Sequence, residues 1–365
     1  MSTSPLTRPR TIAVAAVVVV LLVLPSFTDG FFLTFTMTRV LMLGLAASTL
    51  IFLSSSVGLV SMAQWLLFGI AGFTFGNVVA TSGKGLTLGW PPWLGVVLAI
   101  VVATAVAMVL GALSSRTVGI YFLMLTLTYA VIGFLFFGQV TTFSGSGGVT
   151  GLGPPPLLDG PVRLYYAALV LSVLAYLGFR ALSATPFGLA LQGVRDEPVR
   201  MSALGFNVPL LRVAAFAVAG FVASLAGLLN VWWNGQIDPN SIGLGPTLEL
   251  LIIAVVGGLG YLEGAWLGAF VYLSANLYLR DIPGLGDLDG PFFGRILAEE
   301  RFNTVVGLVL LLVMVASPDG LVGIIERIAR RPEVERAENG SVAEGDAASS
   351  PRAKLALGTE KGEQS

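Results

Sequence analysis

Long apolar runs separated by short polar or glycine-rich intervals make up most of the chain. Between residues 11 and 115 only Asp29, Arg39 and Lys84 carry a charge. A helix needs about 20 apolar residues to cross hydrocarbon roughly 30 Å thick, and several runs reach that length. They lack the alternation with period two of a barrel strand, whereas helices satisfy backbone polar groups within each span. The pattern therefore predicts an all-α, polytopic membrane protein.

The interruptions between apolar runs predict about ten transmembrane helices. They lie near residues 11–28, 33–54, 58–80, 93–113, 118–138, 163–180, 211–233, 244–257, 264–280 and 303–317. One long kinked helix over 244–280 is the alternative to the pair 244–257 and 264–280. The glycines within residues 257–260 and the charge of Glu263 favour a turn, since glycine permits tight reversals and a carboxylate is costly at mid-bilayer.

The distribution of basic residues predicts the orientation, because Lys and Arg of short loops gather on the cytoplasmic side. With the N-terminus inside, the cytoplasmic set is Arg8, Arg10, Arg116, Arg180, Arg195, Arg200, Arg212, Arg327, Arg330, Arg331 and Arg336. We therefore predict a multi-pass cell-membrane protein with both termini cytoplasmic. Residues 1–10 form the cytoplasmic N-terminus and residues 11–325 the membrane domain. Residues 326–365, rich in Glu, Ala, Gly and Ser, form a disordered cytoplasmic tail.

Composition excludes several kinds of chemistry. Of the 365 residues 55% are hydrophobic and 11% charged, against about a quarter charged in soluble proteins. Cysteine and histidine are absent, which excludes disulfides, thiolate nucleophiles and imidazole-ligated metals or haem. No Gly-x4-Gly-Lys-Ser/Thr loop occurs to hold a phosphate. We predict a non-enzymatic chain with no cofactor, no metal and no nucleic-acid partner; any ATP would bind to another chain.

The cytoplasmic interval from Thr185 to Arg212 is long and patterned where the other inner loops are short. Phe187, Leu191 and Val194 fall at i, i+4 and i+7, which is typical of one apolar face of a helix. Pro198 suits the first turn of a second helix, and Gly205 suits its end. We predict two short helices beneath the membrane at about residues 185–211.

This interval resembles the cytoplasmic coupling loop of ABC importer permeases, in the form found in branched-chain amino acid permeases of the LivM type. The family reads approximately small-Pro-Phe-Gly-x-Ala-Leu-x-x-Ile-Arg-Glu/Asp and then Ala-Leu-Gly-x-Asn. The matching residues are Pro186, Phe187, Gly188, Ala190, Leu191, Val194, Arg195, Asp196, Ala203, Leu204, Gly205 and Asn207. The resemblance implies that this loop inserts into a groove of an ATP-binding subunit and that Arg195 and Asp196 transmit motion.

Other blocks resemble the same family in order and spacing, over roughly residues 35–325. Residues 61–64 and 68–70 are similar to a Ser-Leu-Gly-His and Phe-Phe-Gly-Ile-Gly segment, although Gln64 stands where the family often has histidine. Residues 256–269 are similar to its Gly-Gly-x-Gly-x-x-x-Gly-x-x-x-Gly-Ala signature. The residues that the resemblance and helix packing place along the pathway are Ser61, Gln64, Gly69, Gly257, Gly258, Gly260 and Gly264.

The resemblance implies a non-catalytic permease subunit of an ABC-type uptake system in a bacterial membrane. Its partners would be ATP-binding subunits, a second homologous permease and an extracytoplasmic substrate-binding protein, for which the loop 141–160 is the expected docking surface. Branched-chain amino acids lead as the small-molecule substrate, with urea, amides and other small solutes as alternatives. The alternative from another class is an ion-coupled secondary transporter or channel. The scarcity of ionisable residues within the spans, chiefly Arg39 and Glu249, counts against it.

Overall fold

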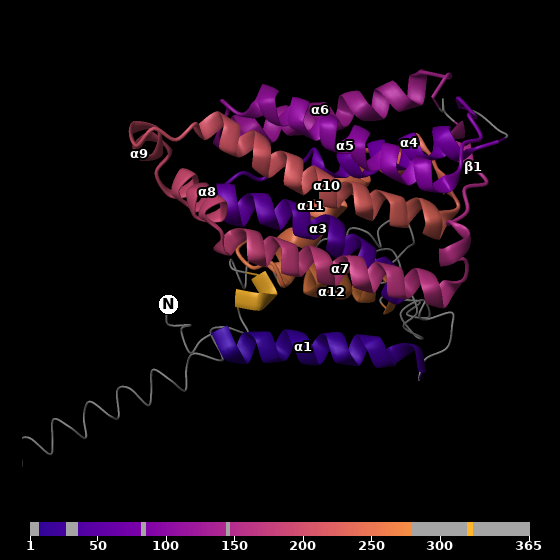
Figure 1. Cartoon of the computed structure of the whole chain (residues 1–365), viewed down its shortest axis with the longest axis horizontal. Coiled ribbons are helices and arrows are strands. Elements are labelled where there is room, and N and C mark those ends of the chain that lie inside the picture. The colour runs from indigo at the N-terminus through magenta and orange to yellow at the C-terminus, as the bar shows by residue number, and fades with distance from the viewer. Residues whose placement is uncertain (1–6, 27–35, 82–84, 144–146, 279–319, 324–365) are drawn as a thin grey trace, which may run out of the picture.

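The computed structural model describes residues 7–26, 36–81, 85–143, 147–278 and 320–323. These residues form a bundle of helices with one short strand pair (Figure 1). The longer helices are α1 (Thr7–Val23), α3 (Thr38–Val57), α4 (Gln64–Val79), α5 (Pro92–Ser114), α6 (Gly119–Gln139), α7 (Pro161–Ala184), α10 (Val208–Asn234), α11 (Leu244–Gly257) and α12 (Gly264–Tyr278). The predicted span 303–317 and the tail 326–365 lie outside the described residues.

Short elements join these helices at the two ends of the bundle. The helices α8 (Pro186–Asp196) and α9 (Pro198–Ala203) connect α7 to α10. The 3-10 turns are η1 (Leu24–Ser26), η4 (Pro156–Leu158) and η5 (Pro239–Ile242). The strands β1 (Val149–Thr150) and β2 (Gln236–Ile237) pair antiparallel, with Val149 opposite Ile237 and Thr150 opposite Gln236.

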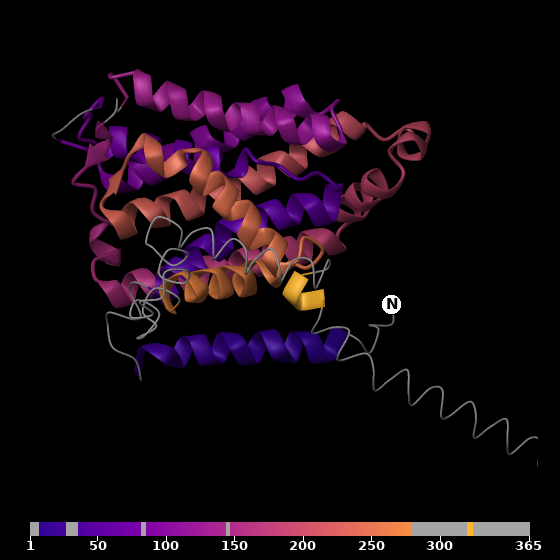
Figure 2. The same cartoon turned by 180° about the vertical axis from the view of Figure 1, so that it is seen from behind.

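The described helices confirm an all-α, multi-pass membrane protein. Six stretches are long and apolar enough to cross a membrane: α3, α5, α6, α7, α10 and Pro239–Gly257. The helix α4 is apolar but shorter, with 16 residues. Each predicted span before 280 overlaps a helix, so the expected number of about ten holds approximately. The turn between 257 and 264 is also confirmed, since α11 and α12 are separate helices (Figure 2).

The helix α3 lies at the centre of the bundle. In α3, 89% of the most apolar stretch is buried, against 22% in α5 and in α6. The helices α7, α10, α11 and α12 surround α3, whereas α5 and α6 lie at the periphery and leave most of their surface for lipid. The face that α5 buries consists of small residues at every fourth position: Gly95, Ala99, Ala103, Ala107 and Gly111.

Small residues bring α4, α5 and α10 close together, as is common between membrane helices. A Cβ atom on Gly220 of α10 would overlap the Ala107 side chain of α5. A Cβ atom on Gly227 would overlap the Phe68 backbone carbonyl of α4. The backbone of α10 therefore lies directly against α4, so neither helix can move far without the other.

The two ends of the bundle differ. The helices α8 and α9 lie at one end, and the β1–β2 pair lies at the other (Figure 1). The first turn of α1 lies at the α8–α9 end, in both the front and the rear view (Figures 1 and 2). The start of α1 and the α8–α9 pair therefore lie at the same end of the bundle, and their cytoplasmic location stays a prediction.

Candidate functional site

The helix α8 begins and ends where its sequence requires. The Thr185 hydroxyl accepts a hydrogen bond from the Gly188 N–H at 3.3 Å, a side-chain cap that stabilises the first turn. Pro186 occupies the first helical position, where a missing N–H is harmless. The helix ends at Asp196, because the residue before Pro198 disfavours helical torsions. Both predicted short helices, α8 and α9, are thereby confirmed.

One face of α8 is fixed to the bundle. Gly188, Ala190, Leu191 and Val194 are buried, and the half-buried Phe187 packs against the same hydrophobic core. A Cβ on Gly188 would overlap the backbone of Leu182 at the end of α7. The corner between α7 and α8 therefore admits glycine alone at this position, and α8 cannot separate from the bundle without breaking apolar contacts.

Arg195 connects α8 to the end of the central helix. Its Nη1 donates a hydrogen bond to the Ser55 backbone carbonyl in α3, and its Nε donates to the Asp196 carboxylate at 2.8 Å. The arginine stem crosses Gly58, where an added Cβ would lie 2.8 Å from the Arg195 Cγ. Gly58 also has a φ of 73°, in the left-handed region that favours glycine. The interaction thus depends on Gly58 as well as on Arg195.

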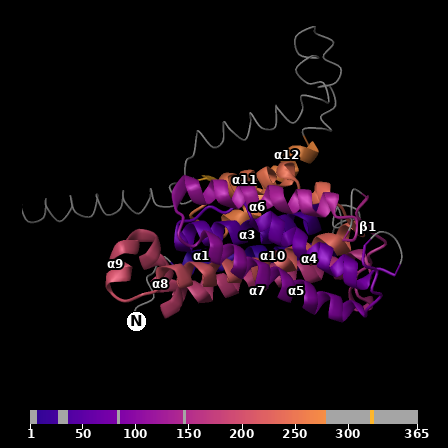
Figure 3. The same cartoon turned by 90° about the horizontal axis from the view of Figure 1, so that it is seen from above.

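The opposite face of the α8–α9 pair carries exposed apolar side chains. No residue of α9 is buried; Val199 is 77% and Leu204 67% exposed. Leu189 and Phe206 are exposed on the same segment, and Figure 3 shows that α8 and α9 project beyond the long helices. Sequence reasoning named Leu204 but missed Leu189, Val199 and Phe206. For Leu189, its position opposite the buried face of α8 was a usable signal.

The coupling residues expected from the sequence therefore fall into two groups. Phe187, Gly188, Ala190 and Leu191 face the bundle. Arg195, Asp196, Leu204 and Gly205 are exposed, and Gly205 has a φ of 90° that ends α9 as expected. The first group holds the helix pair in place together with the Arg195 hydrogen bond to α3. Asp196, Leu204 and Gly205 lie at the surface, and their contact with another chain stays a prediction.

The segment between α3 and α4 is irregular yet buried. Ser61 and Gln64 are completely or almost completely inaccessible. The Ser61 hydroxyl accepts a hydrogen bond from the Ala63 N–H at 3.2 Å, and the Thr126 hydroxyl of α6 accepts one from the Met62 N–H at 3.1 Å. Within the described part of the chain, both amide atoms of Gln64 are buried without a hydrogen-bond partner.

Replacing Gln64 with methionine tests what the buried amide is for. A buried polar group without a partner costs about 1–3 kcal/mol. Gln64→Met keeps the volume and removes that cost, so the purified protein should melt at a higher temperature in detergent. If Gln64 contacts the solute, the same variant should lose uptake. A lower melting temperature would show that Gln64 is already satisfied in the folded protein.

The glycines predicted to lie along the pathway have different surroundings. A Cβ on Gly69 would overlap the Ile242 side chain of η5, and next to it the Trp65 indole N–H donates to the Ser241 carbonyl at 2.7 Å.

The glycines near the turn between α11 and α12 are packed unequally. Gly257 and Gly264 meet backbone to backbone, whereas Gly260 has no neighbouring atom within 4 Å. A Cβ on Gly320 would lie 2.5 Å or less from the backbone of Gly258. Whether any of them contacts a solute stays a prediction.

Two groups of charged residues in the described part of the chain have partners. The Arg39 guanidinium lies 5.7 Å from the Trp233 ring centroid and interacts electrostatically with Glu249, which hydrogen-bonds to Tyr272. Near the α8 end, the Tyr176 hydroxyl donates to Glu263 at 2.8 Å and accepts from Arg180 at 3.1 Å. Among the described residues no group of His, Cys, Asp or Glu is arranged to hold a metal ion.

The multi-pass helical fold and its projecting helix pair define a membrane transport component. Residues 32–315 match the family model described as "Branched-chain amino acid transport system / permease component". The chain belongs to this family of ABC-type permeases, which are non-catalytic membrane subunits. The resemblance found in the sequence is thereby confirmed, and the secondary-transporter alternative is set aside.

Individual relatives are distant. The chain is 28% identical to the probable branched-chain amino acid transport permease protein LivM of Methanocaldococcus jannaschii, over 76% of this chain and 84% of the relative. It is 23% identical to the high-affinity branched-chain amino acid permease LivM of Salmonella typhimurium, over 78% and 68%. It is also 28% identical to the autoinducer 2 import permease LsrC of Escherichia coli, over 90% and 92%. No solved structure matches significantly.

Proposed function

We propose that this chain forms part of the translocation pathway of an ATP-driven uptake system for a small organic solute, with branched-chain amino acids as the first candidates. The observation that carries the proposal is the α8–α9 pair. One face is buried against α3, α7 and α10, and the other presents Leu189, Val199 and Leu204 beyond the spans. Large apolar side chains exposed together are typical of a protein contact.

The position of the exposed α8–α9 face suggests where each partner chain would bind. ATP-binding subunits would bind the exposed face of α8 and α9, on the cytoplasmic side. A second, similar permease would complete the pathway, and a substrate-binding protein would dock on the opposite end, on the loop 141–160 that contains β1. With α8–α9 inside, the start of α1 is also inside (Figure 1), in support of a cytoplasmic N-terminus.

The contacts of Arg195 suggest how movement reaches the pathway. When ATP closes the partner subunits, they would displace α8. Because Arg195 holds the Ser55 carbonyl, the displacement would pass to the end of α3. Residues 58–63 continue directly from that end to Gln64 at the start of α4. A small shift of α8 would therefore alter the buried segment that contains Ser61 and Gln64.

Leu204→Asp tests the docking surface. Placing a carboxylate in an apolar contact imposes a desolvation cost, so the ATP-binding subunits should no longer co-purify with the variant in mild detergent. The measurement is mass spectrometry of the proteins that accompany the tagged chain. Leu86→Asp is the matched control, because Leu86 is also exposed but lies outside the α8–α9 pair. Normal recovery of the ATPase with Leu204→Asp would contradict the assigned surface.

The solute is tested separately by uptake into vesicles. Right-side-out vesicles loaded with ATP should accumulate radiolabelled leucine, isoleucine or valine when the cognate binding protein is present outside. The LsrC relative is described as importing autoinducer 2, so that compound and urea belong in the same panel. If autoinducer 2 or urea, rather than a branched-chain amino acid, is taken up in an ATP-dependent way, the transport role stands and the proposed substrate is wrong.

A further inference from the structure

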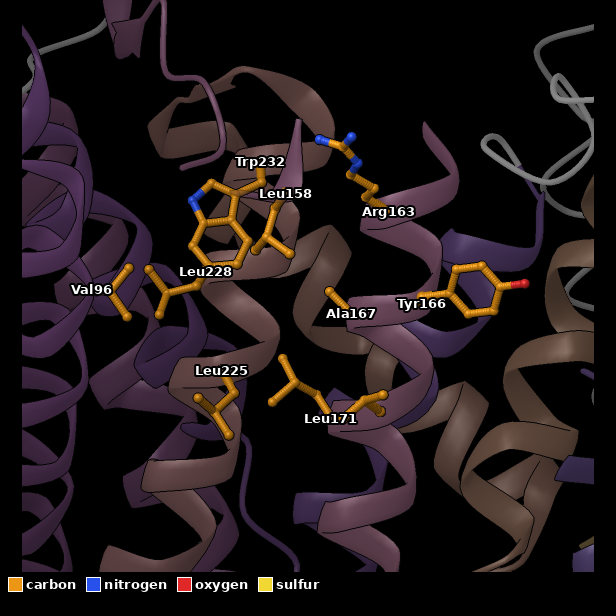
Figure 4. Close-up of a pocket in the computed structure, with 10 residues that line it drawn as sticks. Val96, Leu158, Arg163, Tyr166, Ala167, Leu171, Leu225, Leu228 and Trp232 are labelled. Atoms are coloured by element: carbon orange, nitrogen blue, oxygen red, sulfur yellow. The ribbon is translucent and has the colours of Figure 1, made fainter. Parts of the chain in front are cut away.

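A groove of about 530 Å³ lies between α5, α7 and α10, away from the α8–α9 pair (Figure 4). This volume falls in the range of roughly 300–1,000 Å³ typical of small-molecule sites. Its wall is apolar apart from Arg163 and Tyr166, and the Tyr166 hydroxyl donates to the Leu22 carbonyl of α1 at 3.4 Å. The apolar wall includes Val96, Ala167, Leu171, Leu225, Leu228 and Trp232.

The groove runs parallel to the helices that line it. On α7, Arg163, Ala167 and Leu171 are spaced by four residues and so share one face. On α10, Leu225, Leu228 and Trp232 also share one face. Figure 4 shows Arg163 and Trp232 at the same end of the groove, with Ala167 and Leu171 further along it. This is the end of the bundle opposite α8, since α7 begins there and α10 finishes there.

The groove opens onto the part of the surface that faces lipid. Val170 and Leu174 continue the stripe on α7, and Phe221 continues that on α10; all three are exposed. Val97, next to the groove on α5, is exposed as well. A cavity with such a rim adjoins hydrocarbon rather than water, so its natural occupant is an acyl chain.

Arg163 places a positive charge at one end of the groove, which an acyl chain cannot use but a lipid headgroup can. It is the third residue of α7 and is exposed, and within the described residues no carboxylate forms a salt bridge with it. A helix of 24 residues spans the hydrocarbon completely, so its first turn lies at the level of the lipid headgroups. Arg and Trp are typical anchors at that level.

We propose that this groove binds one phospholipid, with an acyl chain along α10 and the phosphodiester on Arg163. An acyl chain gains little by leaving bulk lipid, because lipid tails are as apolar as leucine. The charge-assisted hydrogen bonds between guanidinium and phosphate therefore determine retention. This site is independent of the transported solute and of the α8–α9 contact.

Native mass spectrometry of the intact transporter tests the proposal. The complex is stripped with detergent and then given either phosphatidylglycerol or diacylglycerol, which has no phosphate. The wild-type protein should retain the phospholipid and not diacylglycerol. Arg163→Ala should retain about tenfold less, the factor expected from losing one hydrogen bond to a charged group. Arg163→Lys should retain an intermediate amount.

A second variant tests the groove apart from the charge. Ala167→Trp fills the groove beside Leu228, which is itself only 1% exposed, and should abolish retention although Arg163 is unchanged. Leu174→Trp adds the same bulk on the exposed stripe beyond the groove and should retain lipid normally. Equal retention by wild type, Arg163→Ala and Ala167→Trp would overturn the proposal.

The rival occupant is another protein chain. The sequence contains no cysteine, so Ala167→Cys creates a single thiol in the groove. If the second permease covers this face, that thiol, once alkylated with a benzophenone maleimide, should photo-cross-link to a partner chain in the assembled complex, and the lipid site would be refuted. If lipid fills the groove, a maleimide carried on a phospholipid acyl chain should label the thiol instead.

Discussion

Arg195→Ala is expected to uncouple ATP hydrolysis from uptake. The variant loses the hydrogen bond to the Ser55 carbonyl and the packing over Gly58, so α8 can move without carrying α3 with it. A hydrogen bond to a charged group contributes about 1.5–3 kcal/mol, which corresponds to roughly a tenfold change or more. In proteoliposomes that contain the whole transporter, uptake should fall about tenfold while ATP hydrolysis continues.

Removing the Asp196 carboxylate should reduce uptake less than removing the Arg195 side chain. The Arg195–Asp196 ion pair is exposed, with side chains 40% and 62% accessible, and exposed pairs contribute only about 0–1 kcal/mol. Asp196→Ala should therefore retain most uptake, and the double variant should resemble Arg195→Ala. Coupled uptake at the wild-type level in the double variant, with normal assembly, would refute the assigned role of Arg195.

Gly257→Ala is expected to destabilise the hairpin of α11 and α12. A Cβ at Gly257 would overlap the Gly264 backbone carbonyl, and a backbone atom cannot rotate away as a side chain can. Overpacking costs about 1–3 kcal/mol where side chains yield, so a clash with a backbone should lie at the upper end. The expected result is a lower melting temperature of the detergent-solubilised protein and less material in the monodisperse peak.

Gly260→Ala is the matched control for this hairpin. Gly260 lies in the same turn but has no neighbouring atom within 4 Å, and its φ is not among the positive values. The control should melt like the wild type. Equal losses in Gly257→Ala and Gly260→Ala would mean that the turn itself, rather than the close approach of the helices, sets the stability.

The sequence was sufficient to predict the helices because the bilayer imposes strict rules. An apolar run of the right length has few alternatives to a helix, and the overlap of predicted and observed spans before residue 280 reflects that constraint. The helices α8 and α9 were also predictable, since Pro186, Pro198 and Gly205 determine local backbone geometry wherever they occur.

Contacts between distant segments were not predictable in the same way. Ser55 and Arg195 are 140 residues apart, and nothing in the sequence of either segment predicts that the two are in contact. Gln64 stood out in the sequence only through the family resemblance, and the structure is needed to show that its amide is buried without a partner among the described residues. The groove at Arg163 could not be predicted from the sequence either, because residues of three separate helices, α5, α7 and α10, line it.

The pairing of β1 with β2 gives α10 a mechanical role. Val149 pairs with Ile237 and Thr150 with Gln236, and the Leu152 N–H donates to the Gly235 carbonyl at 2.9 Å, so the segment between α6 and α7 is attached to the end of α10. Its other end follows α9 directly, and Arg212 there donates to the Ser115 carbonyl at 2.8 Å. A helix of 27 residues is about 40 Å long. Because α10 is one unbroken helix packed directly against α4 and α5, its backbone, rather than a chain of side-chain contacts, links the β1–β2 end of the bundle to the α8–α9 end.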